Sequence, residues 1–228
     1  GLQPNMDRLG GNISLDDTTP VMRVQADRPY LMRGNVYESY TGSGWTVSNT
    51  AAHEWNTDKQ MAEKAFGWYL PAGDDDASRL YRSVFPEQEA SVTMLRRSST
   101  IFAFGILQNL MLEDENVPLY NERGELFSNS VLYPTDSYRF TARINERWRD
   151  TTENFDLLMT YLEESAVYRD PYYGEILQMY TALPHLPSRV QDTARLVAGE
   201  EESPYLQAVR LLEYLQSGEF HYTLSPGS

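Results

Sequence analysis

The sequence has no cysteine, only two lysines and no long apolar run, and each absence excludes a class of protein. Because all 228 residues lack a thiol, the chain has no disulfide, no thiolate metal ligand and no cysteine nucleophile. Its longest mostly apolar stretch, Ile101–Leu107, falls far short of the roughly 20 residues that a membrane-spanning helix needs. With 41% hydrophobic and 12% aromatic residues, the chain is expected to fold around a core.

The charge is strongly one-sided. Lysine and arginine together number 19 against 33 aspartates and glutamates, which leaves a net charge of −14. The lysines are Lys59 and Lys64, and the arginines are scattered without forming a basic stripe. Since nucleic-acid binding depends on clustered cations that displace counterions from phosphates, we predict no nucleic-acid partner.

The familiar metal and catalytic motifs are incomplete. His53 lacks the second histidine that a zinc-binding helix carries four residues later. Gly42–Gly44 lacks the outer glycines of a serine-hydrolase elbow and is typical of a turn. Asp74–Asp76 lacks the spacing of a calcium loop, so we interpret it as a solvated acidic loop. We predict no metal site, no cofactor and no catalytic residue in this chain, although the 33 acids leave room for a carboxylate enzyme whose pair cannot be located.

The first two thirds of the chain are typical of an antiparallel β-domain, either a sandwich or a barrel-like sheet. Short apolar runs alternate there with Gly, Pro, Asn and Asp. A hairpin loop is predicted at Asn121–Gly124 and a short helix at Asp58–Ala65. The predicted strands include Val21–Ala26, Ala90–Leu95, Thr100–Phe104, Val117–Tyr120, Glu125–Phe127 and Ser137–Ile144.

Beyond about residue 150 the apolar period changes from two to 3.6, which predicts four helices and an α+β fold. The first helix has an apolar stripe at Phe155, Leu158 and Leu162. The next three have start signals: Asp170–Pro171, a capping box at Ser188–Gln191, and Ser203–Pro204. The apolar faces expected for the last two helices are Val190, Ala194 and Val197, and Tyr205, Ala208, Leu212 and Leu215.

Two blocks of the sequence carry a resemblance to a known family. In the first, extended segments at Leu9–Leu15 and Pro20–Val24 precede an Arg-Gly step and a Tyr-x-Gly-x-Gly-Trp turn. The motif residues of this block are Arg33, Gly34, Tyr37, Tyr40, Gly42, Gly44 and Trp45. The second block is Leu186–Leu215 with the extended segment Phe220–Pro226. Together they resemble the membrane-anchored bacterial transglutaminase-like proteins, in which membrane helices precede an extracytoplasmic region.

The resemblance implies a division of the chain and a place for it in a larger protein. Residues 1–150 form a mostly β N-terminal domain, 151–185 a helical connector, and 186–228 the first helices and strand of a transglutaminase-like core. We expect the segment Phe220–Leu224 to belong to a domain whose remainder lies beyond this chain. Family members use a Cys-His-Asp triad for acyl transfer, and their cysteine follows the segment that ends here. No residue of this chain then inherits a catalytic role.

The implied function is non-catalytic and extracytoplasmic: the chain positions a catalytic core, and its partners are that core and the membrane helices of the same polypeptide. Binding of protein or cell-wall substrate is a further expectation, with Trp68 and Tyr69 as its possible surface. For Trp45 we favour a place in the core of the sheet. The alternative is a free-standing β-sandwich module that binds carbohydrate or protein, and it predicts an exposed strip of aromatic rings.

Overall fold

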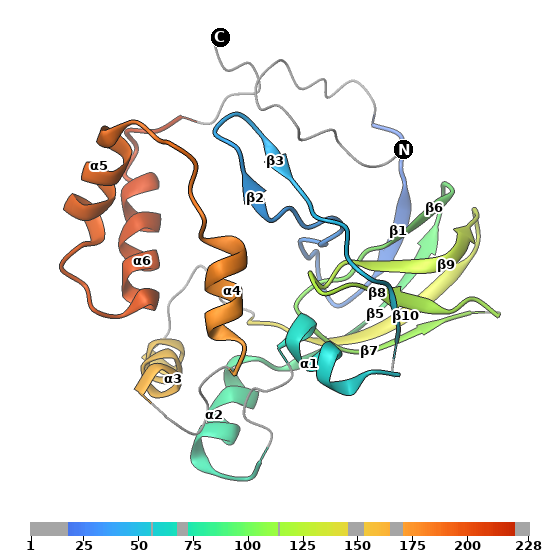
Figure 1. Cartoon of the computed structure of the whole chain (residues 1–228). Helices are drawn as coiled ribbons and strands as arrows, with labels where there is room; N and C mark the ends of the chain where they lie inside the picture. The colour runs from blue at the N-terminus through green and yellow to red at the C-terminus, as the bar shows by residue number, and fades with distance from the viewer. Residues whose placement is uncertain are drawn as a thin grey trace. The chain divides into compact units, whose positions relative to one another are not determined.

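The computed structural model describes residues 18–55, 57–67, 73–113, 115–145, 153–164 and 171–221. The chain divides into two compact units (Figure 1). Unit 1 contains Thr19–Tyr37 and Val47–Tyr173, and unit 2 contains Glu38–Thr46 and the residues from Gly174 onward. Among the described residues, no helix is long and apolar enough to cross a bilayer.

Within the described ranges, unit 1 contains two open antiparallel sheets of four strands each. The first has the order β1-β5-β10-β7, and the second has the order β4-β8-β9-β6. The strands of the first sheet are β1 (Met22–Gln25), β5 (Glu87–Met94), β10 (Ser137–Arg143) and β7 (Ile106–Leu112). Those of the second are β4 (His53–Glu54), β8 (Pro118–Tyr120), β9 (Leu126–Leu132) and β6 (Ser98–Ile101).

Both sheets contribute to one hydrophobic core. The buried positions alternate along β5 and β10, as a strand with one face toward the core requires. Val92 and Tyr138 from the first sheet are fully buried, as are Tyr120 and Ile101 from the second. The Tyr138 hydroxyl donates to the carbonyl of Phe102 and accepts from its N–H, both at 2.9 Å. Burial raises the pKa of Tyr138 well above its usual value, so the phenol stays protonated at neutral pH.

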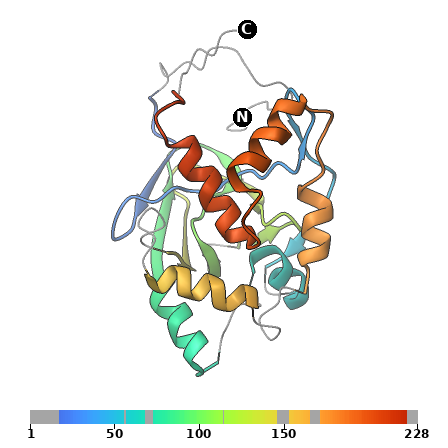
Figure 2. The ribbon, with the colours of Figure 1, turned by 90° about the vertical axis from the view of Figure 1, so that its left-hand side faces the viewer.

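Three helices lie in the described part of unit 1. Helix α1 (Lys59–Phe66) begins at Asp58, whose side chain accepts from the N–H of Met61, and it ends at Gly67 with φ +70°. Helix α2 (Asp76–Val84) packs against α3 (Glu153–Glu164) in a second buried cluster (Figure 2). The residues of this cluster are Tyr81, Val84 and Leu158, with Leu80, Phe85, Phe155 and Leu162 around them.

The sequence did not predict α2, because its first turn was interpreted as a solvated acidic loop. Asp75 is the N-cap of α2, and its carboxylate accepts from the N–H of Ser78 at 2.7 Å. Arg79 pairs with Asp76 in the first turn and donates to the carbonyl of Asp74. The three acids therefore start a helix, where negative charge favours the N-terminal dipole.

In its described residues, unit 2 contains a small hairpin and three helices. Its elements are β2 (Ser39–Tyr40), β3 (Trp45–Thr46), α4 (Tyr173–Tyr180), α5 (Ser188–Ala198) and α6 (Pro204–Leu215). The four helices predicted after the sheets, α3 to α6, are all present, and with the sheets they confirm the α+β class. Helices α5 and α6 lie side by side (Figures 1 and 2).

The helix signals of unit 2 had mixed outcomes. Ser203 caps α6 as predicted, accepting from the N–H of Leu206 at 3.1 Å, with Pro204 in the first turn. The capping box at Ser188 is wrong, because Pro187 occupies the N-cap and no side chain caps α5. Most of the predicted apolar face of α6 is exposed as well, and no residue of that helix is buried. Asp170 and the segment 222–226 lie outside the described residues.

Candidate functional site

The family-motif residue Arg33 is bound to unit 1 at two places. Its backbone pairs with Ala103, with Arg33 N–H donating at 2.7 Å and Ala103 N–H donating back at 3.3 Å. Its guanidinium Nη2 donates to the carbonyl of Gly124 at 3.0 Å. The next residue, Gly34, passes close to an aromatic ring, since a Cβ there would lie 2.7 Å from Cε1 of Phe102. Arg33 and Gly34 therefore attach this segment to residues 102–103 and to the loop at Gly124.

The loop between β8 and β9 receives this segment. It is the hairpin loop that the sequence predicted at Asn121–Gly124, and Gly124 has φ +71°. A Cβ at Gly124 would lie 2.7 Å from the carbonyl oxygen of Ala65 and 3.1 Å from Nη2 of Arg33. Only glycine combines that backbone conformation with so close an approach.

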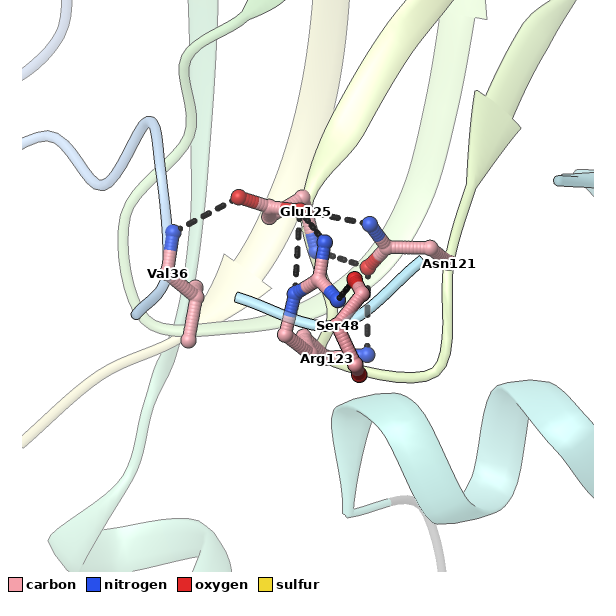
Figure 3. A network of polar contacts seen from close by, with 5 residues as sticks. All are labelled: Val36, Ser48, Asn121, Arg123 and Glu125. Carbon is pink, nitrogen blue, oxygen red and sulfur yellow. Dashed lines mark hydrogen bonds and ion pairs between the residues drawn. The ribbon is translucent and has the colours of Figure 1, made fainter. Parts of the chain in front are cut away.

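Three side chains of this loop form a polar cluster, which we call the clamp: Asn121, Arg123 and Glu125 (Figure 3). Arg123 Nη2 is 2.7 Å from Glu125 Oε2, and the two side chains are only 7% and 18% exposed. Asn121 Nδ2 donates to the same oxygen at 2.5 Å, while its Oδ1 accepts the N–H groups of Arg123 and Glu125, each at 3.1 Å. Such mutual pairing offsets the cost of removing the two charges from water.

The clamp holds two segments that are distant in sequence. Glu125 Oε1 accepts the N–H of Val36 at 2.8 Å, and Arg123 Nη1 donates to the carbonyl of Ser48 at 2.7 Å (Figure 3). The chain passes from unit 1 to unit 2 after Tyr37 and returns at Val47. Both ends of this excursion are thus fastened to one loop of unit 1. The sequence did not reveal the clamp, because the two segments that it holds lie 75 and 89 positions away from it.

The remaining motif residues shape the β2–β3 hairpin. The Thr41 N–H donates to the carbonyl of Gly44 at 3.0 Å, and the Thr41 hydroxyl accepts the N–H of Gly44 at 3.0 Å. Gly42 has φ +94°, as the predicted turn requires. The rings of Tyr40 and Trp45 lie 5.2 Å apart, and the Tyr40 hydroxyl donates to the carbonyl of Gly42 at 2.9 Å.

The favoured core position of Trp45 is not what the structure shows. Trp45 is half-buried in the two-stranded hairpin of unit 2, outside both buried clusters. Tyr37 is likewise half-buried. Trp55 is the core tryptophan of the described residues, 6% exposed and edge-on to Phe66. Trp68 and Tyr69 lie outside the described residues, so their role as a binding surface stays a prediction.

No constellation for catalysis emerges from the described side chains. Within those ranges, no group of three His, Asp or Glu side chains lies close enough to hold a metal ion. His53 lies opposite Tyr120 in the sheet, with ring centroids 5.5 Å apart, which is a packing arrangement. The geometry of the clamp is suited to fastening chain segments together, since each of its charged groups is hydrogen-bonded within it.

The clamp predicts a specific dependence of stability on pH. Burial raises the pKa of Glu125, but its hydrogen bonds from Val36, Asn121 and Arg123, with the charge of Arg123, outweigh burial and hold it below the usual value. The unfolded glutamate titrates near pH ~4.3. Because the folded pKa is the lower one, the stabilisation is complete above that pH and is lost as the pH falls through the folded pKa.

Urea unfolding of the wild type and Glu125→Gln from pH 7 to pH 3 measures this contribution. We expect the variant to be less stable at pH 7 and the gap to shrink as the pH falls below about 4.3, because the unfolded state then takes up a proton at Glu125 before the folded state does. A gap of constant size across this range would contradict the predicted ionisation.

Known proteins were similar to this chain in fold but not in sequence. No protein-family model matches the sequence, and no curated protein matches it. The fold is similar to a crystal structure of the periplasmic domain of TgpA from Pseudomonas aeruginosa, with a TM-score of 0.51 and 16% identity over 91% of this chain. The ethylmercury-bound form of that domain has a TM-score of 0.49 and 15% identity, also over 91% of this chain. The chain spans 59% of the first structure's chain and 60% of the second.

Proposed function

We propose that this chain is the non-catalytic, extracytoplasmic N-terminal portion of a membrane-anchored transglutaminase-like protein, and that it positions a catalytic core. The observation that carries the proposal is the similarity in fold to the TgpA periplasmic domain, which extends over 91% of this chain. The order of the Arg-Gly step and the Tyr-x-Gly-x-Gly-Trp turn supports the same assignment from the sequence side.

The absence of cysteine supports a non-catalytic role. Acyl transfer by a Cys-His-Asp triad needs a thiolate, and this chain has none. In the proposed protein the nucleophile follows this chain. In such a protein the clamp would hold the β2–β3 hairpin in place, because it fastens the chain before the hairpin at Val36 and after it at Ser48 to unit 1.

Unit 2 has the surface expected of a part that another segment covers. Helices α4 and α6 contain no buried residue, and α5 buries only Ala198. Large apolar side chains are open to solvent, with Leu196 at 86%, Leu183 at 68% and Leu215 at 57% exposed. Large exposed apolar side chains are characteristic of interaction sites when they form a patch. We propose that the rest of the transglutaminase-like core covers it.

The test compares this chain alone with the same chain continued in frame along its natural gene. We expect the continued protein to contain a cysteine near a helix start and to transfer acyl groups, and the chain alone to show no transfer. Amide hydrogen exchange in α5 and α6 should slow at least tenfold in the continued protein. A Cys-to-Ala variant of the continued protein controls for the chemistry while leaving the packing intact.

Two results would contradict the proposal. One is a natural sequence that continues without the Cys, His and Asp residues. The other is equal exchange protection of α5 and α6 in both proteins, which would favour a free-standing binding module.

A further inference from the structure

Strand β1 lies at one edge of its sheet, with β5 on one side and, among the described residues, no strand on the other (Figure 1). In an antiparallel pair, alternate residues exchange backbone hydrogen bonds with the partner. The Leu95 N–H donates to the Val21 carbonyl at 3.0 Å, so Val21 and, by alternation, Arg23 are bonded to β5. The N–H and C=O groups of Met22 and Val24 therefore point away from β5, toward the outer edge.

The other edges of the two sheets are blocked by their own side chains or are very short. On β7, Asn109 Oδ1 accepts the N–H of Leu110 at 2.9 Å, and Gln108 Nε2 donates to two β7 carbonyls. On β6, the hydroxyl of Ser98 accepts the N–H of Thr100 at 3.0 Å. Strand β4 has two residues. Side chains that occupy edge groups in this way prevent pairing with another strand, and the part of the chain that the structure describes shows no such arrangement on β1.

A pocket of about 450 Å³ lies beside the β1 edge. Its lining residues are Val24, Ala26, Arg28, Pro29, Tyr30 and Met32. Val24 is opposite the fully buried Val92, so its side chain is on the core-facing side of the sheet, yet it remains 38% exposed. A strand added beside β1 would place alternate side chains on this side, where the pocket can receive an apolar one.

Exposed arginines lie within β1 and next to it, in contrast with the acidic chain. Arg23 and Arg28 are exposed in the segment 21–28, where Asp27 is the single acid. Arg96 donates its backbone N–H to the carbonyl of Val21 at 3.2 Å, and both Arg96 and Arg97 are exposed. Arg28 lines the pocket and lies over the Tyr30 ring at 5.1 Å, whereas Arg23 alternates with Val24 and is on the other face of β1, in a chain with net charge −14. This distribution favours a partner with carboxylates and disfavours a second copy of the acidic chain.

We propose that the outer edge of β1 binds an extended peptide with alternating apolar and acidic residues by strand addition. Backbone groups of Met22 and Val24 pair with the peptide, an apolar side chain enters the pocket beside Tyr30, and acidic side chains lie near the arginines. The site is separate from the proposed positioning role, because it is complete within unit 1 and binding is measured on this chain alone.

The test is fluorescence anisotropy with a labelled hexapeptide of the sequence Glu-Val-Glu-Leu-Glu-Val. We expect saturable binding that weakens as salt rises. Val24→Pro is the informative variant: the N–H it removes points away from β5, so proline at this edge position leaves the ladder to β5 intact. It should weaken binding about tenfold, the loss expected for one backbone hydrogen bond. Val24→Ala, which keeps the N–H, is the matched control and should bind more tightly than Val24→Pro.

Several results would overturn the proposal. Circular dichroism and thermal melting first establish that both variants are folded. The proposal fails if the hexapeptide does not bind, or if Val24→Pro binds it as the wild type does. Two further peptides are N-methylated, one at the Glu residues and one at the apolar residues. The proposal fails if both bind as well as the unmodified peptide, because strand addition needs the N–H groups of one of these two sets. Equal binding of Lys-Val-Lys-Leu-Lys-Val, or dimerisation of the chain through this edge, would likewise overturn it.

Discussion

Arg123→Met is expected to destabilise unit 1 by about 2–3 kcal/mol, because it leaves the largely buried carboxylate of Glu125 without its cation. The two side chains are 7% and 18% exposed, so water replaces little of the lost interaction. The variant also loses the hydrogen bond from Nη1 to the carbonyl of Ser48. The measurement is the free energy of unfolding from urea denaturation at pH 7. At pH 4 the deficit should be smaller, since Glu125 without its cation protonates more readily.

The matched control is Arg79→Met, which removes an exposed ion pair with Asp76. Those side chains are 60% and 98% exposed, and surface pairs of this kind contribute at most about 1 kcal/mol. The double variant Arg123→Met with Glu125→Gln should recover part of the loss, because it removes the buried charge as well. If Arg123→Met costs no more than Arg79→Met, the clamp does not stabilise the fold.

Phe104→Ala is expected to cost about 3–5 kcal/mol, the usual result of emptying a large aromatic site in a core. Phe104 is 1% exposed and contacts two other rings. Its centroid is 4.1 Å from that of Tyr30, in a stacked arrangement, and 4.9 Å from that of Phe140, edge to face. The variant therefore loses apolar burial and two aromatic pairs.

Thermal or urea unfolding measures this loss of stability. Two further variants serve as controls. Phe104→Leu keeps most of the apolar volume and should retain most of the stability. Met111→Ala changes a side chain that is 55% exposed on β7, and should alter stability by no more than about 0.5 kcal/mol. A Phe104→Ala protein as stable as Met111→Ala would show that the two sheets do not depend on this core.

Local signals predicted individual elements well where the hydrogen bonds that define the element are local. Asp58 caps α1 and Ser203 caps α6, in each case through an N–H three residues away. The predicted loop at Asn121–Gly124 is present for the same reason, since Gly124 donates its N–H to Asn121. A reader of the sequence sees both partners of these bonds in one short window.

The misses have a common physical cause. Strand β7 was not predicted, because its apolar residues do not alternate cleanly and its assignment depends on pairing with β10. Helix α2 was not predicted beyond an acidic loop at Asp74–Asp76, although Tyr81 and Val84 are buried there against Leu158, more than 70 positions away along the chain. Periodicity shows which residues share a face, but not what covers that face. The exposed apolar residues of α6 illustrate the difference.

The sequence by itself determined the absence of thiol chemistry, the acidic charge, the caps of α1 and α6, and the change from strands to helices. Each depends on composition or on residues a few positions apart. The tertiary structure alone decided the clamp and the unblocked edge of β1. Glu125 reaches Val36 across 89 positions, and β1 is an edge because of the strand order in its sheet. Such contacts arise when distant segments pack together, and a short window of sequence contains only one of the two partners.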